Sequence, residues 1–210
     1  MYSCFSFADR EERNRCVCKI FHRYIQGKVL DVGCDERHIF KYAICDYYIG
    51  IDLYGKPDIR VDLEDGLPFL DRAFDTVICL EVLEHIDHFH FLFNELCRVA
   101  KHYVIIGLPN MYYWRWRLRF LLGRKISEKY GLPLDPPKDR HRWLFSLNEA
   151  REWLMISCKK IGFKVVSQGY GFFKYKSLIG HFLNKAEITL SLFMPNVVAA
   201  GFYAVIERKL

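Results

Sequence analysis

Two acidic residues mark the ends of two neighbouring apolar runs in this sequence. The first run, Val29–Val32, contains Asp31 and stops at Gly33, and the run Ile49–Ile51 stops at Asp52, 19 residues after that glycine. A glycine after a strand lets the chain turn tightly and approach a ligand, and an acid at the end of the next strand can accept hydrogen bonds from ribose hydroxyls. This spacing is typical of a Rossmann-like βαβ unit that binds adenosine.

His85 is the side chain whose position favours acid–base chemistry. It follows the apolar run Phe74–Leu80, at the end of a strand where ligands bind in open α/β folds, and imidazole titrates near neutrality. A helix-capping or surface histidine is the alternative interpretation. His88 and His90 lie nearby, but only His88 shares a helical face with His85 and no carboxylate pair completes a ligand set. The sequence therefore predicts no metal site.

Length and composition indicate one globular domain. The chain has 210 residues, 51% of them apolar, and it contains no repeat or Ser/Gly/Pro-rich tract, which argues against solenoid and disordered proteins. Its eight cysteines include no CxxC pair, and several lie within predicted strands and helices, as in a reducing compartment. No signal-peptide pattern and no run of about 18 apolar residues is present. We therefore expect a cytoplasmic protein without a transmembrane segment.

Hydrophobic periodicity predicts an alternation of strands and helices. The predicted strands are 28–32, 47–52, 59–63, 74–80, 103–108, 163–167 and 202–207. Predicted helices cover 11–26 and 88–100, and a third begins at a capping box formed by Ser146 and Glu149 and ends at Gly162.

The order of these elements predicts an α/β fold. We expect a Rossmann-like three-layer sandwich whose seven-stranded sheet is mostly parallel, with an antiparallel final strand. Residues 1–210 are expected to form a single domain, with a lid over the ligand at about 111–145 and a helical insertion at about 172–200. The insertion is expected to cover one face of the sheet, with contact to a second copy of the chain or to a membrane surface as the alternative.

Several segments together resemble the class I S-adenosylmethionine-dependent methyltransferases. They are Val29–Cys34, Asp52, Val61–Phe69 and Phe74–Ile86, and their order and spacing match over roughly residues 25–110. The segment Leu108–Arg124 is similar to the methionine-biosynthesis W branch of the type 11 methyltransferases, which extends the likeness to about residue 150. The resemblance implies S-adenosylmethionine as cofactor and methyl transfer as the reaction.

The resemblance also assigns residues to the cofactor. Gly33 resembles the first glycine of the cofactor loop, Asp31 the acid beneath the methionine part of the cofactor, Asp52 the acid that binds both ribose hydroxyls, and Asp62 the residue that accepts from the adenine amino group. The complete predicted set is Asp31, Gly33, Cys34, Asp35, Arg37, Asp52, Leu53, Asp62, Leu63, Leu80 and Glu81.

The cofactor loop departs from the family pattern. The family usually carries GxGxG, whereas Asp35 and Arg37 stand here at the second and third glycine positions. A carboxylate at that place can clash with the cofactor or repel its methionyl carboxylate, while Arg37 can pair with that carboxylate. If the side chains of these residues fill the cofactor site, the catalytic interpretation fails.

Two basic and aromatic clusters follow the fifth predicted strand, where this fold builds its acceptor side. They are Tyr112–Arg119 and Lys138–Trp143. Interleaved arginine and aromatic side chains can bind phosphate or carboxylate groups, although packing of the aromatic residues with solvated arginines explains the same pattern. The predicted acceptor contacts are Asn110, Tyr113, Arg115 and His141.

We therefore expect a methyltransferase that modifies an oxygen or nitrogen atom of a small or medium, anionic acceptor, with His85 as the catalytic base. The alternatives are a non-catalytic partner protein that kept the fold, and an RNA methyltransferase. The net charge of +6 and the absence of a separate RNA-binding module make RNA the less favoured partner. Peripheral membrane contact and a monomeric or homodimeric state stay open.

Overall fold

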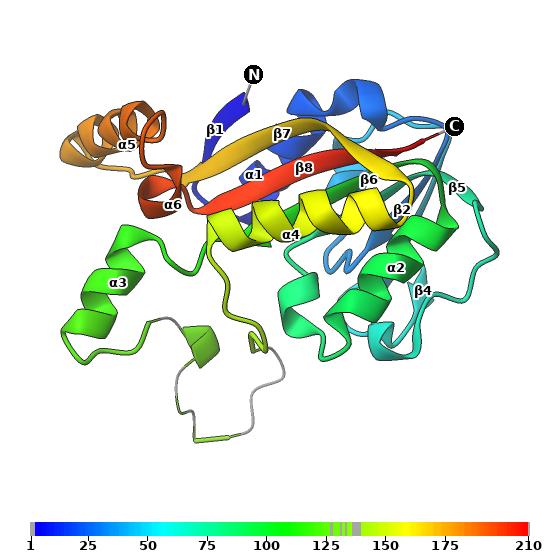
Figure 1. Cartoon of the computed structure of the whole chain (residues 1–210), viewed down its shortest axis with the longest axis horizontal. Coiled ribbons are helices and arrows are strands. Elements are labelled where there is room, and N and C mark those ends of the chain that lie inside the picture. Colours follow the sequence, from blue (N-terminus) through cyan, green and yellow to red (C-terminus); the bar gives the residue numbers. More distant parts are fainter. Residues whose placement is uncertain (1–2, 127, 131, 133, 136–139, 210) are drawn as a thin grey trace.

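The computed structural model describes residues 3–126, 128–130, 132, 134–135 and 140–209. Within these residues, eight strands form one sheet with the order β1-β7-β8-β6-β5-β2-β3-β4 (Figure 1). The strands are β1 Ser3–Phe7, β2 Lys28–Val32, β3 Tyr47–Asp52, β4 Ile59–Arg60, β5 Phe74–Leu80, β6 Ala100–Pro109, β7 Phe163–Phe173 and β8 Gly201–Arg208. β8 runs antiparallel to both of its neighbours, and the remaining pairs are parallel.

Helices cover both faces of the sheet, which confirms the three-layer sandwich. The helices are α1 Arg10–Ile20, α2 Phe89–Val99, α3 Trp114–Leu121, α4 Leu147–Lys160, α5 Leu178–Leu190 and α6 Pro195–Val198. Two buried clusters separate by face, because successive side chains of a strand point to opposite sides. Leu30 packs with the residues of α2 and α4, while Val29 packs with α1 and β1.

Local sequence explains where the covering helices begin. Asp9 precedes α1 and its carboxylate accepts a hydrogen bond from the main-chain N–H of Glu12. At α4 the Ser146 hydroxyl and the Glu149 side chain form the predicted capping box, because each accepts a hydrogen bond from the other residue's main-chain N–H. Gly162, with φ of +75°, follows the C-cap of that helix.

The edge strand β1 is the largest addition to the predicted sheet. It pairs with β7, more than 160 residues later in the chain, and buries Phe5 and Phe7 beside Tyr203. The two C-terminal strands also run longer than predicted, whereas the third predicted strand is reduced to the two residues of β4.

Most of the insertion between β7 and β8 does not cover a face of the sheet, although Ile188, Val197 and Val198 pack against the buried cluster that includes residues of α4. In Figure 1, α5 lies beyond the end of the sheet, next to α6. Apolar side chains of this region are exposed, including Leu178, Phe182 and Leu192. The prediction of a covering helix is therefore wrong. Among the described residues, no helix combines the length and apolar character needed to cross a membrane.

Candidate active site

A cleft of about 660 Å³ opens at the carboxyl ends of β2, β3 and β5. β3 lies on one side of β2 and β5 lies on the other, so the strand order reverses at β2. Open α/β sheets bind their ligands at such a point, and the volume suits a ligand of cofactor size. Ten of the eleven predicted cofactor residues line the cleft: Asp31, Gly33, Cys34, Asp35, Asp52, Leu53, Asp62, Leu63, Leu80 and Glu81.

The loop after β2 follows the backbone path of a glycine-rich turn although it has one glycine. Gly33 has φ of +75°, and Asp35 and Arg37 have φ of +47° and +59°. A Cβ atom at Gly33 would lie 2.2 Å from a methyl carbon of Val82, so this position requires glycine. The other two residues adopt the left-handed conformation at a cost of about 1–2 kcal/mol each.

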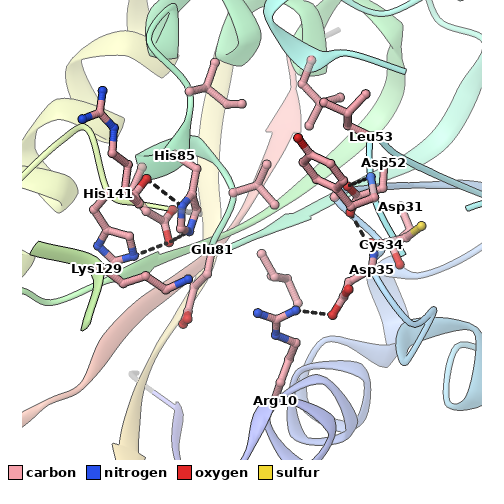
Figure 2. Close-up of a pocket in the computed structure, with 18 of the residues that line it drawn as sticks. Arg10, Asp31, Cys34, Asp35, Asp52, Leu53, Glu81, His85, Lys129 and His141 are labelled. Atoms are coloured by element: carbon pink, nitrogen blue, oxygen red, sulfur yellow. Dashed lines mark hydrogen bonds and ion pairs between the residues drawn. The ribbon is translucent and has the colours of Figure 1, made fainter. Parts of the chain in front are cut away.

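The side chains that replace the two glycines lie at the rim of the cleft or outside it. The Asp35 carboxylate forms an ion pair with Arg10, and both groups are partly exposed (Figure 2). Arg37 pairs with Asp58 at 2.8 Å and lies over the rings of Phe40 and Tyr48. Arg37 is therefore not among the residues that line the cleft, and its predicted contact with the cofactor stays a prediction.

Main-chain groups of this loop are held by β3. The N–H groups of Gly33 and Cys34 donate to the carbonyl of Ile51 at 2.8 and 3.2 Å. The Asp52 carboxylate accepts from the N–H of Asp35 at 2.9 Å and from that of Tyr54 at 3.0 Å. These bonds fix the position of Asp52, and each carboxylate oxygen keeps a second acceptor site for a ligand.

Asp31 lies beneath the loop and is almost completely buried. Its carboxylate accepts a hydrogen bond from the Tyr48 hydroxyl at 2.6 Å. Burial raises the pKa of Asp31 to about 7, because the charged form loses its hydration. The neighbouring Cys34 thiol stays protonated, since burial raises its pKa to about 12.

Glu81 begins the opposite wall of the cleft, directly after β5. It has φ of +56°, and its two carboxylate oxygens accept hydrogen bonds from Arg13 and from the Tyr203 hydroxyl, both at 2.6 Å. Arg13 was not predicted as a site residue. A signal was present in the sequence, because Arg13 stands four residues before Val17 and eight before Phe21, in line with the buried face of α1.

His85 lies in a short 3-10 helix, Leu83–His85, and is joined to a second segment of the chain. Its Nδ1 lies 3.1 Å from the carbonyl oxygen of Arg140, and the N–H of Arg142 donates to the Glu84 carbonyl at 2.8 Å. These contacts bring His141 against His85, with ring centroids 4.6 Å apart. Since a carbonyl oxygen can only accept, Nδ1 of His85 carries the proton in this contact.

The Glu84 side chain is fully buried beside these two imidazoles. Its Oε1 lies 3.6 Å from Nε2 of His85 and 3.9 Å from Nε2 of His141. Burial raises the pKa of Glu84 to about 8, and burial lowers the pKa of His85 and lowers that of His141 to about 4. Lys129 lines the same wall (Figure 2). His88 and His90 do not belong to this group, because neither lines the cleft.

Three predicted acceptor contacts have a structural role instead. Asn110 is buried and its amide donates to the carbonyls of Asn196 and Ala199, at 3.0 and 2.8 Å. The Tyr113 hydroxyl donates to Glu187 at 2.5 Å, and Arg115 lies 4.4 Å from the centre of the Tyr175 ring. None of the three lines the cleft. Their polar groups hold the C-terminal insertion, and of the predicted acceptor contacts only His141 faces the site. Residues 138 and 139, the first two of the second basic cluster, lie outside the described residues.

The geometry agrees with the comparison to protein families. The family model described as a methyltransferase domain matches residues 9–168, more than half of the chain. The chain belongs to this methyltransferase family. No curated protein sequence matches it significantly.

Solved structures of methyltransferases share the fold of this methyltransferase domain. An S-adenosylmethionine-dependent methyltransferase from Archaeoglobus fulgidus has 18% identity and a TM-score of 0.60, with 95% of each chain covered. One from Methanosarcina mazei has 17% identity and a TM-score of 0.56, covering 91% of this chain and 97% of that one. Magnesium protoporphyrin IX methyltransferase from Synechocystis PCC 6803, with SAH bound, has 14% identity and a TM-score of 0.56, covering 95% and 83%. Family and fold together support a class I methyltransferase with S-adenosylmethionine as its cofactor.

The left-handed backbone at Asp35 makes a testable prediction for this methyltransferase domain. Asp35→Gly and Asp35→Ala both remove the ion pair with Arg10, but only alanine keeps the steric cost of a positive φ. We expect the glycine variant to be more stable than the alanine variant by about 0.5–1 kcal/mol, after allowing for the greater freedom of glycine in the unfolded chain. Chemical denaturation measures the difference. An alanine variant as stable as the glycine variant would show that the loop does not hold this conformation.

Proposed function

We propose that this protein transfers the methyl group of S-adenosylmethionine to an oxygen or nitrogen atom of a small or medium, anionic acceptor. One observation carries the proposal: the cleft joins a wall of adenosine-binding type, around Asp31 and Asp52, to a wall with His85 and His141 (Figure 2). A donor and an acceptor bound to these two walls would meet in the middle of the cleft.

Residues of the first wall suit the parts of the cofactor. Asp52 binds the two ribose hydroxyls through its remaining lone pairs, and these charge-assisted bonds contribute about 1.5–3 kcal/mol. Asp31 faces the methionine end, where its carboxylate attracts the ammonium group. Asp62, whose side chain caps the short helix Leu63–Asp65, and the buried Leu63 lie where the adenine ring is expected.

Catalysis in this cleft depends mainly on orientation. The bound cofactor supplies an electrophilic methyl group, so the protein needs to hold an acceptor lone pair in line with it and to exclude water. His85 lies on the second wall, where the acceptor is expected to bind. The contact of Nδ1 with the Arg140 carbonyl holds the imidazole at this wall, where it can take a proton from the acceptor.

Cations at that wall support an anionic acceptor. Lys129, Arg140 and Arg142 line the cleft close to His85 and His141. Arg142 forms an ion pair with Asp87, and Lys129 interacts electrostatically with the buried Glu84. A phosphate or carboxylate group of the acceptor would add negative charge beside these cations.

Replacement of the ribose-binding acid tests the cofactor assignment. Asp52→Asn is expected to weaken S-adenosylmethionine binding by about 10- to 100-fold, because a charge-assisted pair of hydrogen bonds is lost. Calorimetric titration measures the affinity. The matched control is Asp71→Asn, an acid that lies outside the cleft and pairs with Arg98 on the surface. Equal affinity of the Asp52 variant and the wild type would contradict the assignment.

The burial of Asp31 predicts a pH dependence of cofactor binding. Its pKa of about 7 lies above that of an unfolded-chain aspartate, so ionisation of this group costs the free protein stability as the pH rises from about 4 to about 7. Only the ionised form attracts an ammonium group. Affinity for S-adenosylmethionine should therefore rise by roughly tenfold between pH 5.5 and pH 7.

Asp31→Asn provides the control for this pH dependence, since it keeps the size of the side chain and removes the titrating group. Its affinity should be lower at pH 7 and nearly independent of pH over the same range. A wild-type affinity that is constant or falls between pH 5.5 and pH 7 would show that Asp31 does not face the ammonium group.

A further inference from the structure

Three potential metal ligands converge on the second wall of the cleft. One carboxylate oxygen of Glu84 and one ring nitrogen each of His85 and His141 lie within 4.8 Å of one another. They come from two segments, 83–85 and 140–143, which main-chain and side-chain hydrogen bonds hold together. The group is therefore fixed by the fold and does not depend on long, exposed side chains.

Glu84 is the unusual member of this group. Its side chain is 1% exposed, and neither of its carboxylate oxygens has a hydrogen-bond partner among the described residues. A buried carboxylate without hydrogen bonds is costly unless a positive charge or a proton balances it. Among the residues that the structure describes, no donor bonds to this carboxylate, so a proton or a bound cation has to balance it.

No positive group within the described part of the chain donates a hydrogen bond to Glu84. Arg13, the cation of the adjacent network, donates to Glu81 at 2.6 Å, and Tyr203 occupies the other oxygen of that residue. Lys129 acts electrostatically on both Glu81 and Glu84 and is the protein cation that would compete for this position. Both carboxylate oxygens of Glu81 already accept hydrogen bonds from Arg13 and Tyr203. The carboxylate that can bind a metal ion is therefore that of Glu84.

Both imidazoles turn a ring nitrogen toward this carboxylate. Nε2 of His85 lies 3.6 Å from Glu84 Oε1, and Nε2 of His141 lies 3.9 Å from the same oxygen. Nδ1 of His85 faces the carbonyl oxygen of Arg140, and this contact fixes the orientation of the His85 ring. A proton or a metal ion can be shared among these three groups.

We propose that Glu84, His85 and His141 bind one divalent cation of the first transition row, such as Mn²⁺ or Co²⁺. Metal–ligand distances of about 2.0–2.2 Å allow two donors on one ion to lie up to about 4.2 Å apart, so the two measured separations need only small side-chain adjustments. One carboxylate with two imidazoles is a ligand set of intermediate softness that leaves open coordination positions.

The role of the cation rests on the proposed function. Glu84, His85 and His141 line the cleft, and so does Asp52. An ion held by the first three would bind an oxygen atom of the acceptor and lower the pKa of its hydroxyl group, whose proton would be released to solvent water as the methyl group is transferred. His85 is then a metal ligand and not the base, and the acceptor class narrows to oxygen nucleophiles with a second oxygen or an anionic group nearby.

Titration with Mn²⁺ tests the site without the cofactor. The full chain, freed of metal with a chelator, is titrated with Mn²⁺ and free ion is followed by electron paramagnetic resonance. Mn²⁺ is preferred because it avoids the eight thiols of this chain. We expect one bound ion per chain and an increase in the relaxation rate of solvent-water protons, since open positions exchange water. A bound ion without that increase would overturn the open coordination.

Variants identify the ligands. Glu84→Gln and His141→Ala should each weaken Mn²⁺ binding by at least about tenfold. His88→Ala is the control, because His88 is exposed, pairs with Glu64 and lies outside the group. Glu84→Gln removes a buried charge, so its folding is not expected to suffer, and it keeps the test valid if the histidine variant is unstable. Wild-type protein that binds no Mn²⁺, or variants that bind it as tightly as the wild type, would overturn the proposal.

Calorimetry with S-adenosylmethionine separates this proposal from the proposed function. The cofactor is titrated into the metal-free wild type and into Glu84→Gln, where Asp31 and Asp52 are intact. Cofactor binding without Mn²⁺ binding would reject the metal site alone and leave Lys129 as the partner of Glu84. Mn²⁺ binding without cofactor binding would reject the proposed function and keep the cation site.

Discussion

The loop that follows β2 must enter the left-handed region of backbone conformation three times within five residues, at Gly33, Asp35 and Arg37. Only the first of these is a glycine, so the surrounding structure has to hold the other two. It does so through the Asp52 carboxylate, which accepts the N–H of Asp35, and through the Ile51 carbonyl, which accepts two N–H groups. The same acid that suits a ribose therefore also fixes the loop against which the cofactor would lie.

A residue with left-handed backbone also lies on the opposite wall of the cleft. Glu81, at the end of β5, also has a positive φ and is held by Arg13 and Tyr203. Such residues persist only where their neighbours determine the conformation, and they are common at ligand sites. Here the strained positions lie on both walls, so the buried sheet stabilises a cleft whose own residues are not at their lowest energy.

Much of the central fold could be predicted from the sequence. β2 and β5 are mostly buried on both faces and therefore appear as nearly continuous apolar runs, β3 keeps a buried centre at Gly50 and Ile51, and the capping box of α4 is a local signal. β1 could not be predicted in this way, because its short aromatic run is stabilised by β7, which is distant in the chain. Polar residues after β6 were ambiguous for a related reason. Asn110 and Tyr113 could bind a ligand or satisfy buried groups, and only the placement of the C-terminal helices decides between these roles.

Glu84 shows the same limit at the site itself. His85, the next residue in the sequence, could be predicted as a site residue from its place after β5. The burial of the Glu84 carboxylate could not, because it depends on the segment 140–143, which lies more than 50 residues later in the chain and packs against it. Adenosine binding follows from the end of a strand and a single loop, so it has a local signature. The acceptor wall is assembled from distant segments, and its chemistry becomes visible only in the folded chain.

A crystal structure with S-adenosylhomocysteine bound would test most directly whether this cleft serves the cofactor despite its altered loop. The account predicts ribose hydroxyls within hydrogen-bond distance of the Asp52 carboxylate, with Asp35 and Arg37 in their left-handed conformations and their side chains outside the cofactor. A ligand bound elsewhere, or the side chain of Asp35 or Arg37 in the place of the methionine end, would contradict it.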